Sequence, residues 1–357
     1  MKHFTRIIAI IGLIAVMALS VPFISSCKPE IQTVTATTTK TVTSTSATTL
    51  ISTSIETANN TVTSTSTKTE TLVSTVTETV QLISVTDDAG ITYTFEGPVD
   101  SIVSLAPAIT EIVYFVGAGD KLIGRTDYCN YPEEVSGVAS IGGYYDPNKE
   151  KIILLNPDVV LADSIQCTTG DVEWLQSQGL TVIVIVPSDI EGVMRDIMLV
   201  GTLAGNQDFA ADAVAGLEDR IDAVCNALSG LGEEEKPSVL HITWYDPLWT
   251  VGKYSFLDIV IDMAGGINIF GDVEWDVQVD LEQAVIRNPD IITVVTDHGS
   301  EISFYSVIAE DSPFNKTNAY LNGCIYIVDS DIVCRAGPRI VDALELYAGL
   351  LHPDLFS

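Results

Sequence analysis

A short sequence unit occurs twice in this chain, at 150–158 and at 282–290. Each copy places a Glu six residues ahead of an Asn-Pro-Asp triplet, and a β-branched run follows the triplet. Because the residue before proline is disfavoured in the α region, each unit predicts a short helix that ends before the proline. The run after the triplet predicts a buried parallel strand. A duplicated helix-to-strand unit indicates two similar α/β lobes, and a cleft between two lobes is a common place for a ligand.

Residues 1–26 have the composition of an export signal. The start is basic, 7–24 is almost wholly apolar, and Ser-Ser precedes Cys27. This order describes a secretory signal. With Cys at the cut and Ile24 three residues before it, the pattern is similar to a bacterial lipoprotein signal, whose Cys becomes the acylated N-terminus. We therefore expect lipidation at Cys27 and a chain anchored to the outer face of the cytoplasmic membrane. The alternative is an uncleaved transmembrane anchor, since the apolar run is nearly long enough to span.

Residues 27–84 are dominated by Thr and Ser. Val residues alternate with Thr in parts of this segment, so local propensity permits a β-strand. The segment lacks side chains large enough to build a core, and low-complexity polar tracts do not offset the entropy of the chain. The composition therefore predicts a flexible stalk. Whether its hydroxyls are glycosylated stays open.

The remainder divides into three parts. Strands alternate with helices over 85–188, which predicts an N-terminal α/β lobe with a parallel sheet. Residues 189–232 show helical periodicity, and the helix expected at 207–228 would be ~33 Å long at 1.5 Å per residue, enough to reach from one lobe to the other. A charged boundary near 233 precedes a predicted strand at 239–244, so 233–357 is expected to form a C-terminal α/β lobe.

Charge and cysteine usage exclude several classes of partner and site. The formal net charge of -31 at pH 7 argues against nucleic acid and against an anionic membrane surface as partners. Lipidation of Cys27 would leave five cysteines at irregular spacing, which is no disulfide framework and no zinc motif. Whether Cys324 and Cys334 pair stays open.

An enzyme and a metal-ion receptor are the alternatives from other classes. The sequence has no Gly-x-Ser-x-Gly and no Walker loop, and the glycines at 117 and 119 lack the third glycine of a dinucleotide site. His241 and His298 would have to act alone, and with Asp163 they make only a loose set of metal ligands. A ferric-ion site stays open as an alternative, because phenolates are good ligands for ferric ion. The candidate phenolates are Tyr128, Tyr131, Tyr144 and Tyr145. We expect no enzymatic activity, no catalytic residues and no bound metal or cofactor.

Five segments in order carry a resemblance to a known family. They are the two duplicated units and the stretches Ile102–Glu111, Gly124–Pro132 and Arg335–Arg339. Together they resemble the substrate-binding proteins of ABC importers for cobalamin, ferric siderophores and haem, from about residue 97 to the end. The resemblance implies two Rossmann-like lobes joined by one long helix. It also implies a non-enzymatic, monomeric protein that delivers a small molecule to a permease dimer with a cytoplasmic ATPase.

The closest pattern within that family is the cobalamin binder, which implies a corrinoid ligand, with a ferric siderophore or haem as alternatives. The resemblance places ligand-binding aromatics at Tyr128 and Tyr144 in the first lobe and at Trp249 and Trp275 in the second, although Trp275 needs a one-residue shift. A large flat ring with polar fringes calls for aromatic faces, worth ~0.5–1.5 kcal/mol each beyond buried area. One departure is that a cleft Trp of the cobalamin binder corresponds here to Asp163 or its neighbour.

Polar contacts complete the implied site. The resemblance places paired polar residues at Asp331 and Arg335, where they would orient the fringe of the ligand. It also assigns one permease-docking carboxylate to each lobe, Glu150 and Glu282. A pseudo-symmetric pair of carboxylates on one face suits a two-fold permease that presents an Arg pocket from each half.

Overall fold

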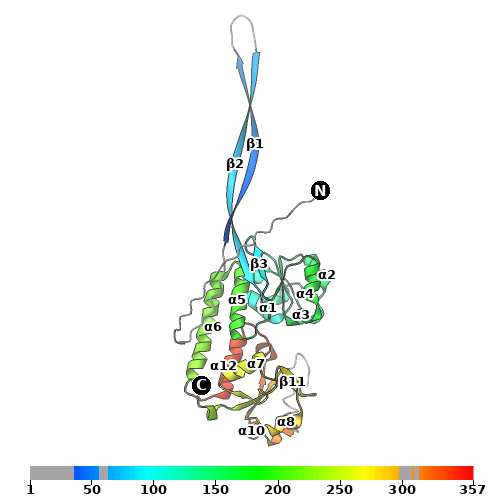
Figure 1. The fold of residues 1–357 in the computed structure, drawn as a ribbon, viewed down its shortest axis with the longest axis vertical. Coiled ribbons are helices and arrows are strands. Elements are labelled where there is room, and N and C mark those ends of the chain that lie inside the picture. The colour runs from blue at the N-terminus through cyan, green and yellow to red at the C-terminus, as the bar shows by residue number, and fades with distance from the viewer. Residues whose placement is uncertain (1–35, 56–62, 297–307, 309–312, 357) are drawn as a thin grey trace, which may run out of the picture. The chain divides into compact units, whose positions relative to one another are not determined.

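The computed structural model describes residues 36–55, 63–296, 308 and 313–356. At the N-terminal side β1 (Ala36–Ile55) and β2 (Thr63–Thr86) form an antiparallel ribbon, and β3 (Thr92–Phe95) pairs with the last residues of β2 (Figure 1). In the described part of the predicted stalk the chain is therefore extended and paired, which local propensity permitted. Thr and Val favour extended backbone because they are β-branched, and pairing satisfies the backbone groups of both strands.

The first lobe is built on a parallel four-stranded sheet. Its strand order is β5-β4-β6-β7, with β4 at Ile102–Ser104, β5 at Leu122–Arg125, β6 at Val159–Ala162 and β7 at Val182–Val184. The helices are α1 (Pro107–Phe115), α2 (Lys149–Leu155), α3 (Ser164–Thr169) and α4 (Asp171–Ser177), with 3-10 turns at Gly119–Lys121 and Glu133–Gly137. Every residue of β4, β6 and β7 is buried, as expected for strands covered on both faces. The sequence did not predict α3, which begins at a capping box between Asp163 and Gln166.

The lobes are connected by α6 (Gln207–Leu228), which packs along α5 (Ile190–Ala204). The start of α6 is tied to the first lobe, because the Asn206 amide donates to the backbone oxygen of Val116 at 2.9 Å. Further along α6, the Arg220 guanidinium pairs with Asp342 and Glu345 of the C-terminal helix, each at 2.6 Å. The predicted inter-lobe helix at 207–228 is therefore confirmed (Figure 1).

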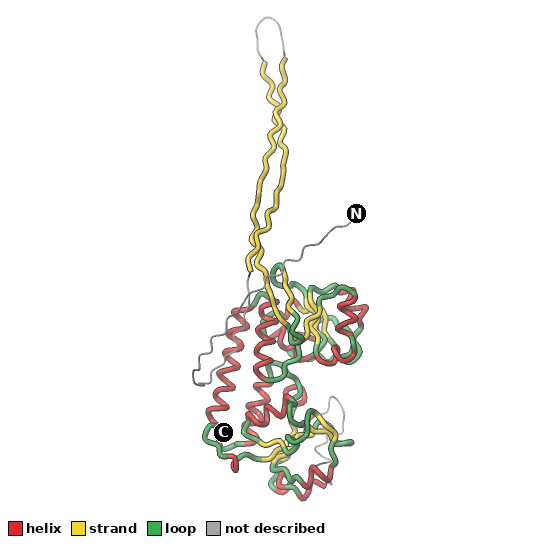
Figure 2. The backbone as a smooth tube through the Cα atoms, in the orientation of Figure 1, coloured by secondary structure: helices red, strands yellow, loops and turns green. Residues whose placement is uncertain are grey.

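The second lobe repeats the topology of the first. Its parallel sheet has the order β10-β8-β12-β13, with β8 at Ser238–Ile242, β10 at Ile267–Asn268, β12 at Ile291–Val295 and β13 at Ile325–Val328. An antiparallel pair, β9 (Trp249–Val251) and β11 (Asp276–Gln278), lies beside it. The helices are α7 (Phe256–Met263), α8 (Leu281–Ile286), α10 (Asn318–Leu321), α11 (Ser330–Val333) and α12 (Ile340–Leu351), with 3-10 turns at Glu233–Glu235 and Pro313–Lys316 (Figure 2). Within the described ranges, no helix combines the length and the apolar character that crossing a membrane requires.

The duplicated sequence unit performs the same structural task in both lobes. The Asn of each triplet adopts the left-handed conformation, with φ of 46° and 48°; Asn156 caps α2, and Asn288 directly follows Arg287, the cap of α8. The carboxylate of Asp158 accepts from the backbone nitrogen and the hydroxyl of Ser101, at 2.9 and 3.0 Å. Asp290 accepts from the same two groups of Ser238, at 3.0 and 2.6 Å. Each triplet therefore fastens the third strand of its sheet to the start of the first strand, and the two-lobe prediction is confirmed.

Candidate functional site

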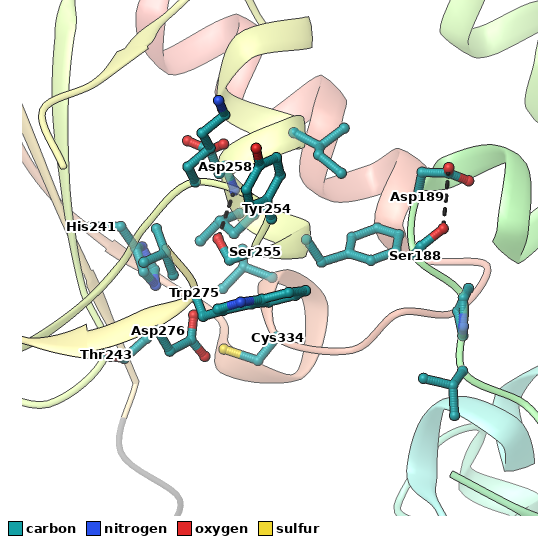
Figure 3. A pocket seen from close by; sticks show the side chains of 18 residues that line it. Ser188, Asp189, His241, Thr243, Tyr254, Ser255, Asp258, Trp275, Asp276 and Cys334 are labelled. Atoms are coloured by element: carbon teal, nitrogen blue, oxygen red, sulfur yellow. Dashed lines mark hydrogen bonds between the residues drawn. The ribbon is translucent and has the colours of Figure 1, made fainter. Parts of the chain in front are cut away.

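A cavity of about 1040 Å³ lies between the second lobe and the segment 186–189, which leads from β7 into α5 (Figure 3). Asp189 lines it from the first-lobe side, and its carboxylate caps α5 by accepting from the backbone nitrogen of Gly192 at 2.7 Å. Trp275, Tyr254, His241 and Cys334 line it from the second lobe. Both lobes therefore contribute to one concave site, the arrangement expected of a ligand pocket.

Two exposed aromatic rings dominate the cavity wall. Trp275 is 62% exposed and Tyr254 is 50% exposed, and their ring centroids lie 6.0 Å apart. Both residues adopt positive φ angles, 61° and 73°, which is rare for bulky side chains and is found at ligand sites. The backbone approaches closely here, since a Cβ on Gly252 would lie 2.5 Å from the backbone oxygen of Trp275. Trp275 was predicted as a ligand-binding residue from the sequence, whereas Tyr254 was not. A Tyr directly after Gly-Lys matches no motif that would indicate a ligand site.

The floor of the cavity is polar and largely uncharged. The Nδ1 atom of His241 lies 2.9 Å from the Thr293 hydroxyl and 2.9 Å from the Tyr347 hydroxyl, all three side chains being buried. Burial lowers the pKa of His241 to about 3, so the ring is neutral at pH 7. Burial raises the pKa of the Cys334 thiol to about 12 and also raises the pKa of Asp276. The neutral ring of His241 and the Cys334 thiol offer hydrogen bonds to a ligand rather than charge.

The predicted first-lobe aromatics form a cluster of their own. The rings of Tyr128 and Tyr144 have centroids 6.4 Å apart, and Tyr145 stands edge-on to Tyr144 at 4.9 Å. The hydroxyl of Tyr144 donates to the Asp163 carboxylate, and burial followed by that negative charge raises the pKa of Tyr144. None of these residues lines the cavity. Trp249 in β9, also predicted, is partly exposed and likewise does not line it.

The predicted polar pair is engaged between the lobes. Arg335 donates to Asp331 at 2.6 Å, to Glu111 of α1 at 2.8 Å and to the Asn130 side-chain oxygen at 2.8 Å. Asn130 donates in turn to Asp331 at 2.6 Å. Arg339 makes two further bonds to Glu111, at 2.8 and 2.7 Å. The sequence found the pair but not Glu111, Asn130 or Arg339, which complete the network with it.

The remaining predictions concern the docking carboxylates, the lipidation site, the other cysteines and a metal ion. Glu150 and Glu282 lie exposed in the first turns of α2 and α8. Cys27 and the signal segment lie outside the described residues. Cys324 and Cys334 are not bonded to each other. Over the described ranges, no three His, Cys, Asp or Glu side chains converge to hold a metal ion.

Comparisons with known proteins agree on one family. A family model described as periplasmic binding protein matches residues 102–332. The chain is 30% identical over 279 residues to an uncharacterized ABC transporter substrate-binding lipoprotein, YvrC, of Bacillus subtilis, covering 77% of this chain and 87% of YvrC. It is 27% identical to the cobalamin-binding protein of Halobacterium salinarum, covering 76% and 74% of the two chains.

The fold is shared with a solved structure of the same kind. The periplasmic vitamin B12 binding protein BtuF of Vibrio cholerae superimposes with a TM-score of 0.63 at 23% identity, covering 72% of this chain and 98% of BtuF. At that identity the likeness establishes the two-lobed architecture with its connecting helix.

Proposed function

We propose, because this chain belongs to the periplasmic binding protein family, that it captures a corrinoid in the cavity between its lobes and delivers it to the permease of an ABC importer. The cavity of about 1040 Å³ stands at the upper end of the ~300–1,000 Å³ range of ligand pockets, which suits a large ligand. Trp275 and Tyr254 supply exposed aromatic faces for a flat ring.

The charges on the cavity wall favour a corrinoid over haem as the ligand. Asp189, Asp258 and Asp276 line it, whereas Lys253 is the one cationic side chain among the described residues of the wall, since His241 is neutral. The Lys253 ammonium lies 4.8 Å from the centre of the Tyr254 ring. Such a wall suits the neutral amide fringe of a corrinoid better than the carboxylates of haem, which would face like charges. The relative from Halobacterium salinarum is named for cobalamin.

Delivery requires an anchor and a docking surface. We assign lipidation to Cys27, after removal of residues 1–26, which holds the chain at the outer face of the cytoplasmic membrane. We assign permease docking to Glu150 and Glu282, one exposed carboxylate per lobe. The active form is a monomer, because each lobe would face one half of a two-fold permease.

Fluorescence titration tests the ligand and its site together. The chain without its first 26 residues, titrated with cyanocobalamin, should show quenched Trp emission and 1:1 binding. Trp275→Ala should weaken binding about tenfold, while Trp174→Ala, on α4 and away from the cavity, should leave the affinity unchanged. If cyanocobalamin does not quench and a ferric hydroxamate siderophore or haemin does, the ligand belongs to that class instead.

A further inference from the structure

The two copies of the duplicated unit share a surface feature that their docking carboxylates do not account for. Leu154 is 83% exposed and Ile286 is 71% exposed, among the most exposed large aliphatic side chains in the described part of the chain. Each stands four residues after the Glu of its unit, Glu150 and Glu282. Residues four apart on a helix are neighbours on one face, so each carboxylate has an exposed aliphatic side chain beside it.

The helices hold these side chains outward in the same way. Ile152 of α2 and Ala284 of α8 occupy equivalent positions and are fully buried, which fixes the opposite face of each helix against its lobe. In both copies the chain then turns at a left-handed Asn, Asn156 or Asn288, shortly after the exposed aliphatic residue. A single exposed Leu is ordinary on a protein surface. The same exposure at the same position of both repeats is a shared property of the two lobes.

We propose that Leu154 and Ile286 are apolar anchors of a two-point docking surface, and that the occupant is the membrane-embedded permease. This inference rests on the proposed function. Each point combines a carboxylate with an aliphatic knob, so the matching surface is a basic group beside an apolar recess, presented once by each half of a two-fold partner. Buried apolar side chains at the centre of an interface supply more binding energy than charges at its rim.

Two other occupants fit the chemistry less well. An anionic lipid surface would face a chain of net charge -31 that carries a carboxylate next to each aliphatic side chain. A second copy of this chain would carry the same net charge of -31, so the two copies would repel each other. The permease is the partner that would complement both the carboxylate and the aliphatic side chain of each docking point.

Photo-cross-linking in intact cells tests the contact without assuming a ligand. The full chain would carry p-benzoylphenylalanine at position 154 or 286, with matched controls at Phe209 and Ile267, which are also exposed and apolar but lie on α6 and β10. We expect both test positions to cross-link to the permease subunit, identified by mass spectrometry, and both controls to give none. Cross-links from 154 and 286 only to lipid, only to a second copy, or no more than from the controls would overturn the proposal.

A second pair of positions separates this inference from the docking function itself. Lys151 and Gln283 are exposed and directly follow the two docking carboxylates. If 151 and 283 cross-link to the permease while 154 and 286 do not, the carboxylates dock and the aliphatic anchors are refuted. If none of the four positions cross-links to the permease, the docking surface as a whole is refuted.

The rate of cellular uptake measures how much the two aliphatic side chains contribute to transport. Cells that carry Leu154→Asp with Ile286→Asp should take up radiolabelled cyanocobalamin about tenfold more slowly, with cyanocobalamin affinity within twofold of the wild type. Leu154→Met with Ile286→Met, which keeps an apolar knob, should retain uptake. Equal uptake by the Asp and Met pairs would overturn the anchors.

Discussion

The contact between Glu111 and two arginines offers the sharpest energetic test of how the lobes are held together. The Glu111 side chain is 2% exposed, and the Arg335 and Arg339 side chains are 11% and 15% exposed. Glu111 accepts three charge-assisted hydrogen bonds from them, all at 2.7–2.8 Å. Glu111 lies on α1 of the first lobe, and both arginines follow α11 of the second.

Truncation to Glu111→Ala would leave two guanidinium groups largely buried without their main counterion. Breaking a buried ion pair by removing one partner costs about 3–5 kcal/mol, because the remaining charge is uncompensated. We therefore expect the free energy of unfolding, from urea denaturation followed by far-UV circular dichroism, to fall by about 3–5 kcal/mol. Glu111→Gln keeps the shape of the side chain and should lower the free energy of unfolding by less than Glu111→Ala.

A matched control comes from the second lobe. Glu345 pairs with Arg220 at 2.6 Å, but their side chains are 41% and 37% exposed, so Glu345→Ala should cost only about 0–1 kcal/mol. Replacing Glu111, Arg335 and Arg339 together by Leu, Met and Met should recover most of the loss, since apolar residues fill the same space without buried charge. If Glu111→Ala is no more destabilising than Glu345→Ala, the network does not hold the lobes together.

Three further outcomes are expected. Burial, reinforced by neighbouring Asp88, raises the pKa of Asp196 to about 8, so its contribution to stability is full below about pH 4 and is lost as the pH rises to 8. Asp196→Asn should therefore have a melting temperature that exceeds the wild type's increasingly between pH 4 and pH 8, and a constant difference would contradict this. Asp158→Ala and Asp290→Ala should each lower the free energy of unfolding by about 1–3 kcal/mol in urea denaturation, because each loses two bonds to a strand, and an effect in only one lobe would contradict the equivalence. Cys27→Ala should abolish incorporation of radiolabelled palmitate, and unchanged labelling would remove the lipid anchor.

The parts of the fold that were predicted correctly depend on local signals. A proline ends a helix at a defined residue, and a long stretch without strong breakers extends one, so the end of α2 before its proline and the bounds of α6 were both predicted. The ribbon of β1 and β2 was not expected, because composition measures whether a segment can build a core. It does not measure how well two distant stretches pair along their backbones.

The positions of the predicted site residues relative to the cavity depend on long-range placement, which the sequence does not show. Trp275 lines the cavity, but Tyr128, Tyr144 and Trp249 do not. Which way a loop aromatic points is set here by left-handed backbone and by the close approach at Gly252, and neither can be seen in residue spacing. Arg335, predicted to bind the ligand, also bonds to the Glu111 carboxylate, 224 residues away in the sequence, and residue spacing does not reveal that contact.

Calorimetric titration of the wild-type chain, without its first 26 residues, with cyanocobalamin tests the proposed function most directly. We predict 1:1 binding with a negative heat-capacity change, because the aromatic and apolar wall of the cavity is removed from water. Prior saturation with cobinamide should compete, since the corrin ring is common to both ligands. Absence of heat with cyanocobalamin, together with 1:1 binding of haemin or a ferric siderophore, would contradict the corrinoid assignment.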